Sequence, residues 1–179
     1  MGIRQFEIDL LTNVLKQQNL SFNNIKMMQL GDQKVRNDPS NEIISGKVFF
    51  EKKGVEVVSI DINGERGSLP IDLSRKIKWP QYKGYFDVIT NFGTSEHIKE
   101  HLICFDNMLY FCRIGGLMIN VVPKEGAFYK RAHRNTHKYT PNFFIQWAKD
   151  HYCDVLQARN VSKEERVSEW VMAVLRRQQ

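Results

Sequence analysis

The sequence predicts an α/β fold in which a mostly parallel sheet lies between two layers of helices and ends in an antiparallel hairpin. Short, nearly all-apolar runs, typical of parallel strands buried on both faces, alternate with segments of helical periodicity. The last two strand-like runs, 154–161 and 169–177, have only a polar stretch between them. Because no helix separates these two strands, we expect them to pair antiparallel.

The first elements follow from hydrophobic spacing. Apolar residues recur at three- and four-residue intervals over 3–18, which predicts an amphipathic helix. The run 26–30 is predicted as the first strand of the main sheet. A second helix is expected over 41–52, with Ser40 or Asn41 as its N-cap.

The middle of the chain holds the most regular pattern. The helical spacing of apolar residues over 98–112 predicts a helix, which Gly115 and Gly116 are expected to end. A later helix is expected to begin at Pro141 with Thr140 as its cap. Three further apolar runs are predicted as strands: 55–62, 86–90 and 117–122.

One connection is too short for the usual crossover. Only a few residues separate Asp61, at the end of the second strand, from the next apolar run, 68–73. A parallel crossover normally takes a dozen residues or more, so the helix between the second and third strands is predicted to be reduced or absent. Pro70 restricts that run to a sheet edge or to a non-strand conformation.

Length and composition narrow the class of protein. The 179 residues are expected to form a single domain over 1–179, and 42% hydrophobic content is ordinary for a globular protein. No apolar run approaches the roughly 20 residues that a membrane helix needs. The N-terminus lacks a basic-then-apolar export signal, so we expect a cytoplasmic protein without membrane association.

The net charge, the cysteines and the histidines say less about binding partners than the hydrophobic pattern says about the fold. The net charge of +6 permits an anionic partner, but the basic residues are scattered and do not predict nucleic-acid binding. The three cysteines show no close pairing of the metal-binding kind, and we expect them to stay reduced. Two histidine pairs with four-residue spacing lack a third ligand, so no metal site is predicted.

Four segments, in this order, carry a family resemblance. They are "VEVVSIDING", "YFDVITNFGTSEHI", "CRIGGLMINVVP" and "HKYTPNFFIQWAKDH". Together they resemble the class I S-adenosylmethionine-dependent methyltransferases of the small-molecule type, a Rossmann-like family whose sheet ends in an antiparallel hairpin. The likeness covers roughly residues 26–177. It implies a transferase that uses S-adenosylmethionine to methylate a small-molecule acceptor.

The resemblance also implies where the cofactor lies. Asp61 closes a buried strand and could accept hydrogen bonds from a ribose diol. The alternative is that Asp61 and Asn63 belong only to a turn, since Asp, Asn and Gly favour turns. Asp72 matches the family's adenine-contacting acid if the short link brings it round. The cofactor-binding residues implied by the family are Gly31, Asp61, Asn63, Asp72, Leu73, Asn91, Phe92 and Gly93.

Substrate and catalytic residues follow the same pattern. Thr94, His137 and Tyr139 are implied as substrate-binding residues. His97, next to Glu96, is a candidate general base because histidine titrates near neutrality. The alternative is that the two residues only form a helix start, with Glu96 at the positive end of the dipole. The basic, aromatic stretch around His137 suits an anionic substrate as well as it suits a solvated loop.

The residues after the first strand depart from the family pattern. Gln29 stands where the family has an acid, and Gln33 and Val35 occupy positions of two later glycines, although Gly31 matches. The loop must therefore be remodelled, which leaves a second hypothesis open: a non-catalytic methyltransferase-fold protein that acts as a binding or scaffold partner. A nicotinamide oxidoreductase is a weaker third hypothesis, because no G-x-G-x-x-G follows this strand.

Overall fold

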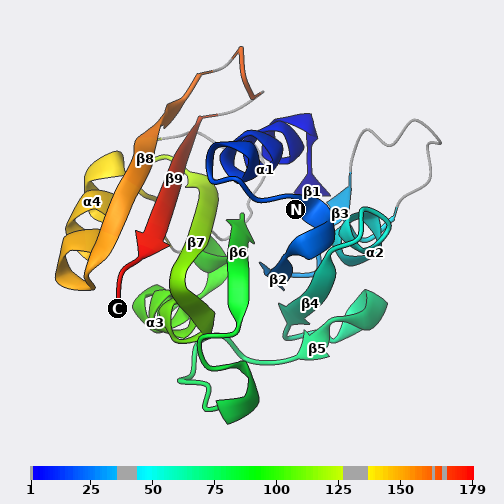
Figure 1. Ribbon diagram of the computed structural model, residues 1–179. Helices are drawn as coiled ribbons and strands as arrows, with labels where there is room; N and C mark the ends of the chain where they lie inside the picture. Colours follow the sequence, from blue (N-terminus) through cyan, green and yellow to red (C-terminus); the bar gives the residue numbers. More distant parts are fainter. Residues whose placement is uncertain (1, 36–43, 127–136, 163, 167–168) are drawn as a thin grey trace.

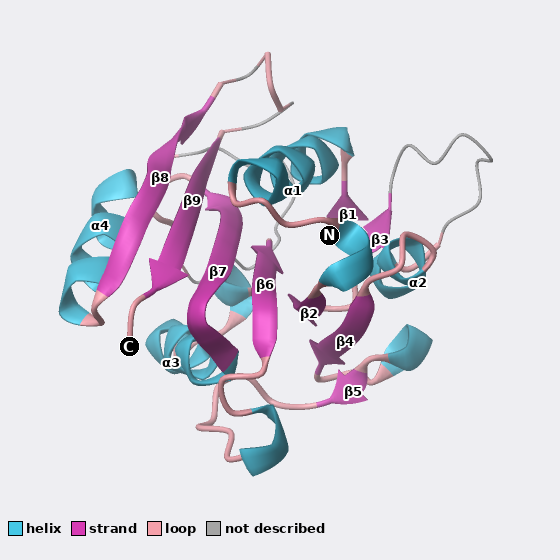
Figure 2. Ribbon diagram, viewed as in Figure 1, coloured by secondary structure: helices cyan, strands magenta, loops and turns pink. Residues whose placement is uncertain are grey.

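The computed structural model describes residues 2–35, 44–126, 137–162, 164–166 and 169–179. Its seven-stranded sheet has the order β5-β4-β2-β6-β7-β9-β8 (Figures 1 and 2). The strands of this sheet are β2 (Lys26–Leu30), β4 (Glu56–Asp61), β5 (Leu69–Pro70), β6 (Phe86–Phe92), β7 (Cys112–Pro123), β8 (Cys153–Val161) and β9 (Trp170–Arg177). The helices are α1 (Gln5–Gln17), α2 (Gly46–Glu51), α3 (His101–Phe111) and α4 (Pro141–Asp150).

The predicted three-layer architecture is confirmed. Neighbouring strands from β5 to β7 pair parallel, while β9 pairs antiparallel with both β7 and β8. A separate parallel pair, β1 (Gly2–Ile3) with β3 (Lys34–Val35), flanks the sheet. Within the described residues no helix is long and apolar enough to cross a membrane.

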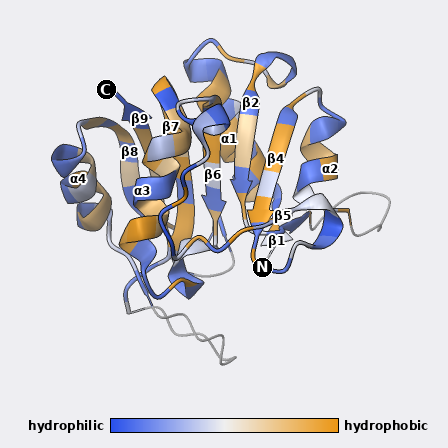
Figure 3. Ribbon diagram, turned by 90° about the horizontal axis from the view of Figure 1, so that it is seen from below, coloured by the Kyte–Doolittle hydropathy of each residue, from blue (hydrophilic) through white to orange (hydrophobic). Residues whose placement is uncertain are grey.

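Each face of the sheet has its own apolar cluster. On one face α1 and α2 contribute Leu11, Leu15 and Phe50, all nearly inaccessible to solvent. On the other face α3 and α4 contribute Phe105 and Phe144. Figure 3 shows hydrophobic residues concentrated along strands such as β4 and β7, between these layers. Burial on both faces explains why the strands read as continuous apolar runs.

The second helix begins later than its apolar spacing predicted. Ser45 is the N-cap, since its hydroxyl accepts a hydrogen bond from the amide of Val48 at 3.2 Å, and α2 starts at Gly46. The predicted caps Ser40 and Asn41 lie outside the described residues. The predicted start was wrong because Ile44, with its carbonyl, accepts from the amide of Val35 at 3.0 Å and so belongs to an extended segment.

The predicted end of the third helix was also wrong. α3 stops at Phe111, and Cys112 already adopts an extended conformation as the first residue of β7. The two glycines lie inside β7, where the pairing with β6 shifts register in an irregularity. A β-carbon on Gly116 would lie 2.8 Å from the sulfur of Cys112 and 2.9 Å from the carbonyl of Arg113. These glycines therefore permit a bulge rather than end a helix.

The short second connection is as predicted. A single 3₁₀ turn, η2 (Glu65–Gly67), stands between β4 and β5 in place of a crossover helix. β5 has two residues and forms the edge of the sheet, which its proline tolerates. The edge of the sheet next to β5 is consequently flanked by loop segments and a 3₁₀ turn, with no crossover helix in this described part of the chain.

A buried ion pair fastens α1 to the turn between β8 and β9. The Nε atom of Arg166 lies 2.6 Å from Oε1 of Glu7, and both side chains are at most 5% exposed. The Arg166 guanidinium also lies 3.6 Å above the ring of Trp170. The second carboxylate oxygen of Glu7 accepts from the amide of Arg4 at 2.9 Å. This pair joins the first helix to the far end of the chain.

We expect Glu7→Ala to lower the free energy of unfolding by about 3–5 kcal/mol, because it takes the carboxylate away from a buried guanidinium. Glu165→Ala is the matched control, since Glu165 forms a solvent-exposed bidentate pair with Arg159. The control should lose less than about 1 kcal/mol. Urea unfolding measures both variants. Equal losses in the two would show that burial does not set the strength of the Glu7 pair.

Candidate functional site

The strands β5, β4, β2 and β6 are neighbours in the sheet (Figure 1). A cavity of about 490 Å³ lies at their carboxyl ends. This volume is in the range of small-molecule sites. In a sheet of this kind, ligands bind in the crevice outside the carboxyl ends of the strands. The lining residues are Gly31, Asp32, Gln33, Asp61, Ile62, Ile71, Asp72, Leu73, Ser74, Gly93, Thr94, His97, Ile98, Lys99 and Glu100.

Gly31 forms the turn at the floor of the cavity. Its φ of 80° lies in the left-handed region, and its amide donates to the carbonyl of Ile60 at 2.7 Å. A β-carbon there would lie 2.4 Å from Oγ1 of Thr94, which in turn donates to the carbonyl of Leu30 at 2.8 Å. Glycine is therefore required at this position both for the backbone conformation and for space.

Asp61 lines the cavity and also accepts hydrogen bonds from the backbone of two neighbouring loops. One carboxylate oxygen accepts from the amide of Asp32 at 2.7 Å, and the other accepts from the amide of Asn63 at 3.1 Å. Each oxygen has two lone pairs, so each can still accept a further hydrogen bond. The side-chain oxygen of Asn63 accepts from the amide of Glu65, and Asn63 is not among the lining residues.

The short link does bring Asp72 to the cavity. Its Oδ1 accepts from both the amide and the hydroxyl of Ser74, at 2.9 and 2.6 Å. These hydrogen bonds, followed by the charge of Arg75, hold the pKa of Asp72 below its usual value, so the group is ionised at neutral pH. Leu73, beside it, is 6% exposed and adds an apolar wall.

The loop after β2 has side-chain hydrogen bonds where the family pattern would place glycines. The amide group of Gln29 donates to the carbonyl of Gly31 at 3.0 Å, and that of Gln33 donates to Oγ1 of Thr94 at 3.2 Å. Gly46, at the start of α2, packs closely against β2: a β-carbon there would lie 2.5 Å from Oε1 of Gln29, so that side chain would have to shift. The sequence prediction missed Gly46 because it fell inside an expected helix and outside the family's spacing.

Asn91 and Phe92 lie behind the lining and are 0% and 3% exposed. The side-chain nitrogen of Asn91 donates to Ser95 Oγ at 2.9 Å and to Asn120 Oδ1 at 3.0 Å. Its oxygen accepts from the amides of Thr94 and Ser95. Asn91 therefore shapes the segment that carries Gly93 and Thr94, and it is these two residues that reach the cavity.

Glu96 and His97 occupy a separate 3₁₀ turn, η4 (Ser95–His97), ahead of α3. His97 lines the cavity, and its Nε2 lies 3.7 Å from a carboxyl oxygen of Glu96, which is inaccessible to solvent. Burial raises the pKa of Glu96 to about 8, so this carboxyl group is mostly protonated at neutral pH. The histidine at the cavity wall can itself accept a proton from a bound group, and the neutral Glu96 carboxyl adds no charge to it.

His137 and Tyr139 hold the cavity wall from outside it. The Tyr139 hydroxyl donates to Ser95 Oγ at 3.0 Å, and the residue is 1% exposed. The His137 amide donates to the carbonyl of Glu96, and its ring stacks on His101 with centroids 3.7 Å apart. Neither residue lines the cavity. They belong to the basic, aromatic stretch 129–139, of which residues 129–136 lie outside the described residues.

Several lining residues were missed by the sequence prediction. Asp32, Ile62, Ile71, Ser74 and Glu100 each lie within a few residues of a predicted strand end or site residue, which is the only signal they give. Across the described ranges, no three His, Cys, Asp or Glu side chains gather as a metal site would require.

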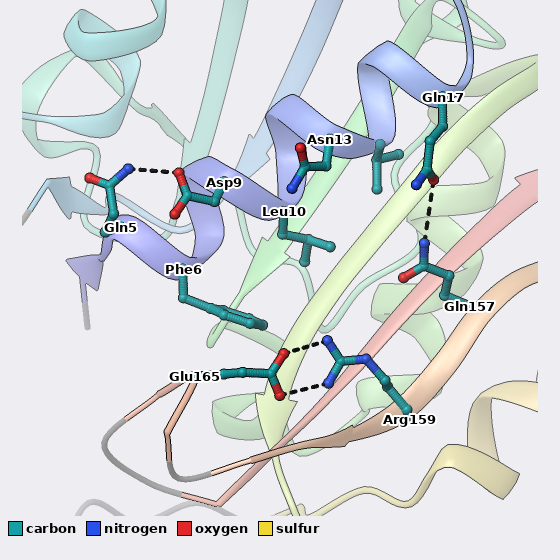
Figure 4. A pocket seen from close by; sticks show the side chains of 10 residues that line it. Gln5, Phe6, Asp9, Leu10, Asn13, Gln17, Gln157, Arg159 and Glu165 are labelled. Atoms are coloured by element: carbon teal, nitrogen blue, oxygen red, sulfur yellow. Dashed lines mark hydrogen bonds and ion pairs between the residues drawn. The ribbon is translucent and has the colours of Figure 1, made fainter.

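A second cavity, also about 490 Å³, lies between α1 and β8 (Figure 4). Its walls are mostly polar, with Gln5 bonded to Asp9 along the helix and Gln17 facing Gln157 across the gap. None of the predicted site residues lines it. It lies away from the strand ends that carry the first cavity.

Comparison with known proteins identifies the fold. No protein-family model and no curated protein sequence matches this chain. Solved structures do match: the 1,6-didemethyltoxoflavin-N1-methyltransferase of Burkholderia thailandensis, crystallised with 1,6-didemethyltoxoflavin and S-adenosylhomocysteine, has a TM-score of 0.66 at 12% identity. That alignment covers 96% of this chain and 76% of the enzyme.

Two more structures extend the comparison. The N-methyltransferase NodS of Bradyrhizobium japonicum, crystallised with S-adenosylhomocysteine, has a TM-score of 0.62 at 13% identity, with 98% and 89% of the two chains covered. The [4+2]-cyclase SpnF has a TM-score of 0.66 at 10% identity, with 97% and 82% covered. The chain therefore has the Rossmann-like fold of class I S-adenosylmethionine-dependent methyltransferases.

The raised pKa of Glu96 makes stability depend on pH. An acid with a pKa of 4.5 unfolded and about 8 folded binds more protons in the native state. Stability conferred by the protonated form is therefore present at low pH and lost as pH rises from about 5 to 8, by up to about 1.4 kcal/mol per pH unit.

Glu96→Gln mimics the neutral acid and should remove that loss. Urea unfolding at pH 5, 6, 7 and 8 would measure the difference in stability between the variant and the unaltered protein, so that other titrating groups cancel. We expect the difference to grow in favour of the variant across this range. A difference that stays constant with pH would mean that Glu96 is already ionised at pH 5.

Proposed function

We propose that this chain binds S-adenosylmethionine in the cavity at the ends of β2, β4, β5 and β6 and transfers its methyl group to a small-molecule acceptor. The observation that carries the proposal is the meeting of Gly31, Asp61 and Asp72 around one cavity, although they come from three different strand ends. The shared fold of the compared methyltransferases supports the same conclusion.

Each part of the cofactor would meet a suitable group. The ribose diol would donate to the remaining lone pairs of Asp61. The adenine ring would lie against Ile62, Ile71 and Leu73, with Asp72 accepting from its amino group. The turn at Gly31 would allow the backbone to approach the rest of the molecule closely.

The acceptor would approach from the side of Thr94 and His97. Methyl transfer from a sulfonium is an in-line displacement in which orientation supplies much of the rate. An acceptor hydroxyl or ammonium must also lose a proton, and His97 lies at the cavity wall to take it. Lys99, another lining residue, would favour an acceptor that carries a negative charge.

The second candidate is a binding or scaffold protein without methyl transfer. The loop after β2 favours it, because side chains from Gln29 and Gln33 occupy space that a glycine-rich loop leaves open. The compared structures include one described as a [4+2]-cyclase, so the fold also occurs in a protein with a different reaction. Cofactor binding and turnover must therefore be tested separately.

Calorimetry with S-adenosylhomocysteine tests the cofactor site. We expect binding, and Asp61→Asn should weaken it by about 10- to 100-fold, since a hydrogen bond to a charged group contributes about 1.5–3 kcal/mol. At 100 times the dissociation constant, the ligand should stabilise the protein by about 2.7 kcal/mol in a thermal unfolding experiment.

Asp154→Asn is the matched control, because Asp154 lies on β8, away from the cavity. This control should bind as the unaltered protein does. Absence of any binding in the unaltered protein would remove the proposed function. An equal loss of affinity in the two variants would place the ligand elsewhere.

Turnover is tested by following S-adenosylhomocysteine release from S-adenosylmethionine with a panel of small phenols, carboxylic acids and amines. For an acceptor that reacts, His97→Gln should lower kcat by about 10²- to 10⁴-fold while affinity for S-adenosylhomocysteine stays within about twofold. An unchanged kcat would assign the rate to orientation alone. Binding without turnover across the panel would favour the scaffold candidate.

A further inference from the structure

We propose that Arg66 is a positioning residue for the cavity, and that its ion pair with Asp32 replaces the conformational role of the missing glycines. By holding Asp32 in place, Arg66 would fix the backbone amide that aims the Asp61 carboxylate. The ligand part of this inference rests on the proposed function, whereas the loop geometry does not.

The first step is the burial of Asp32. Its side chain is 2% exposed and forms an ion pair with Arg66, whose own side chain is 36% exposed. Burying a carboxylate is costly unless a partner compensates it. An ion pair with one end buried in this way is unlike the fully exposed surface pairs that contribute little. Arg66 is thus the group that makes the buried position of Asp32 tolerable.

The second step is the backbone of Arg66 itself. It lies in the left-handed region, with φ 49° and ψ 34°, inside the single turn that stands where a crossover helix is missing. For a residue with a β-carbon this conformation costs about 1–2 kcal/mol. Glu65 holds the guanidinium from the other side, with oxygen and nitrogen 2.9 Å apart. Arg66 is therefore held in a conformation that glycine would adopt more easily, and from this position its side chain reaches Asp32 in the loop after β2.

The third step links the pair to the cavity. The amide of Asp32 donates to Asp61 Oδ2 at 2.7 Å, so the same residue is held by its side chain on Arg66 and by its backbone on Asp61. The next residue, Gln33, is held by Thr94. The loop is therefore held on the β4 side by the contacts of Asp32 with Arg66 and Asp61. On the β6 side it is held by the hydrogen bond from Gln33 to Thr94. Glycines would instead have given it a tight turn without side chains.

The experiment compares Arg66→Ala and Arg66→Lys with the control Lys47→Ala. Lys47 forms an exposed pair with Glu51 on α2, close to the same turn. The ligand-free measurement is hydrogen exchange of the Asp32 amide, followed by NMR. We expect Arg66→Ala to speed this exchange at least about tenfold, because the amide is released from Asp61. Arg66→Lys should restore most of the protection, and Lys47→Ala should leave it unchanged.

The ligand measurement is calorimetry with S-adenosylhomocysteine. Arg66→Ala should weaken binding by about tenfold, and the affinity of the unaltered protein should fall more steeply with added NaCl than that of this variant. Exchange at amides of the central strand β7 serves as the reference for global stability. Should Arg66→Ala unfold, exchange of the Asp32 amide in the unaltered protein at low and high NaCl gives the comparison instead, because salt weakens a partly exposed ion pair.

The outcomes separate this inference from the proposed function. Unchanged exchange at Asp32 in Arg66→Ala would overturn the inference, whether or not the cofactor binds. Faster exchange with unchanged affinity would overturn the positioning role. Faster exchange in a protein that does not bind S-adenosylhomocysteine at all would remove the proposed function and support the role of Arg66 in the loop.

Discussion

The hydrogen bond from the amide of Asp32 to the carboxylate of Asp61 is the contact on which the cavity depends. It joins the residues that follow β2 to the last residue of β4, and both Asp32 and Asp61 line the cavity. Gly31 makes this contact possible, because only a left-handed turn without a β-carbon brings the next amide to that position. The turn is then held on one side by the ion pair of Asp32 with Arg66. On the other side it is held by the hydrogen bond from the Gln33 side chain to Thr94.

Much of the fold could be predicted from the sequence for two physical reasons. Strands buried on both faces must be apolar throughout, and their carboxyl ends meet at one edge once they pair in parallel. Asp61 and Gly31 therefore had to lie near one another if the strands were correctly identified, whereas the position of Asp72 depended on the path of the short link after β4. The missing crossover helix was also predictable, since the length of a connection limits what it can contain.

The remaining features depend on tertiary contacts that local patterns do not encode. Gly46 is a glycine because Gln29 lies against the start of α2, and nothing within the helix itself indicates this. Asn91 lies one residue before the end of β6, where a ligand-binding residue is expected, yet its side-chain hydrogen bonds are made to Ser95 and Asn120 inside the protein. The burial of Glu96 likewise follows from the elements packed around η4 rather than from its neighbours in sequence. The hydrophobic periodicity that predicts the helices and strands does not depend on such contacts. Which individual residues line the cavity does depend on them.

The direct passage from α3 into β7 has a mechanical consequence. Phe111 ends the helix and Cys112 begins a strand at the middle of the sheet, so no slack chain separates them. Glu100, the residue just before this helix, belongs to the cavity wall. That wall therefore continues through α3 directly into an interior strand of the sheet, while the opposite wall consists of short loop segments around β5. We therefore expect a ligand that needs more room to displace the β5 side, where the chain is held in only two residues of strand.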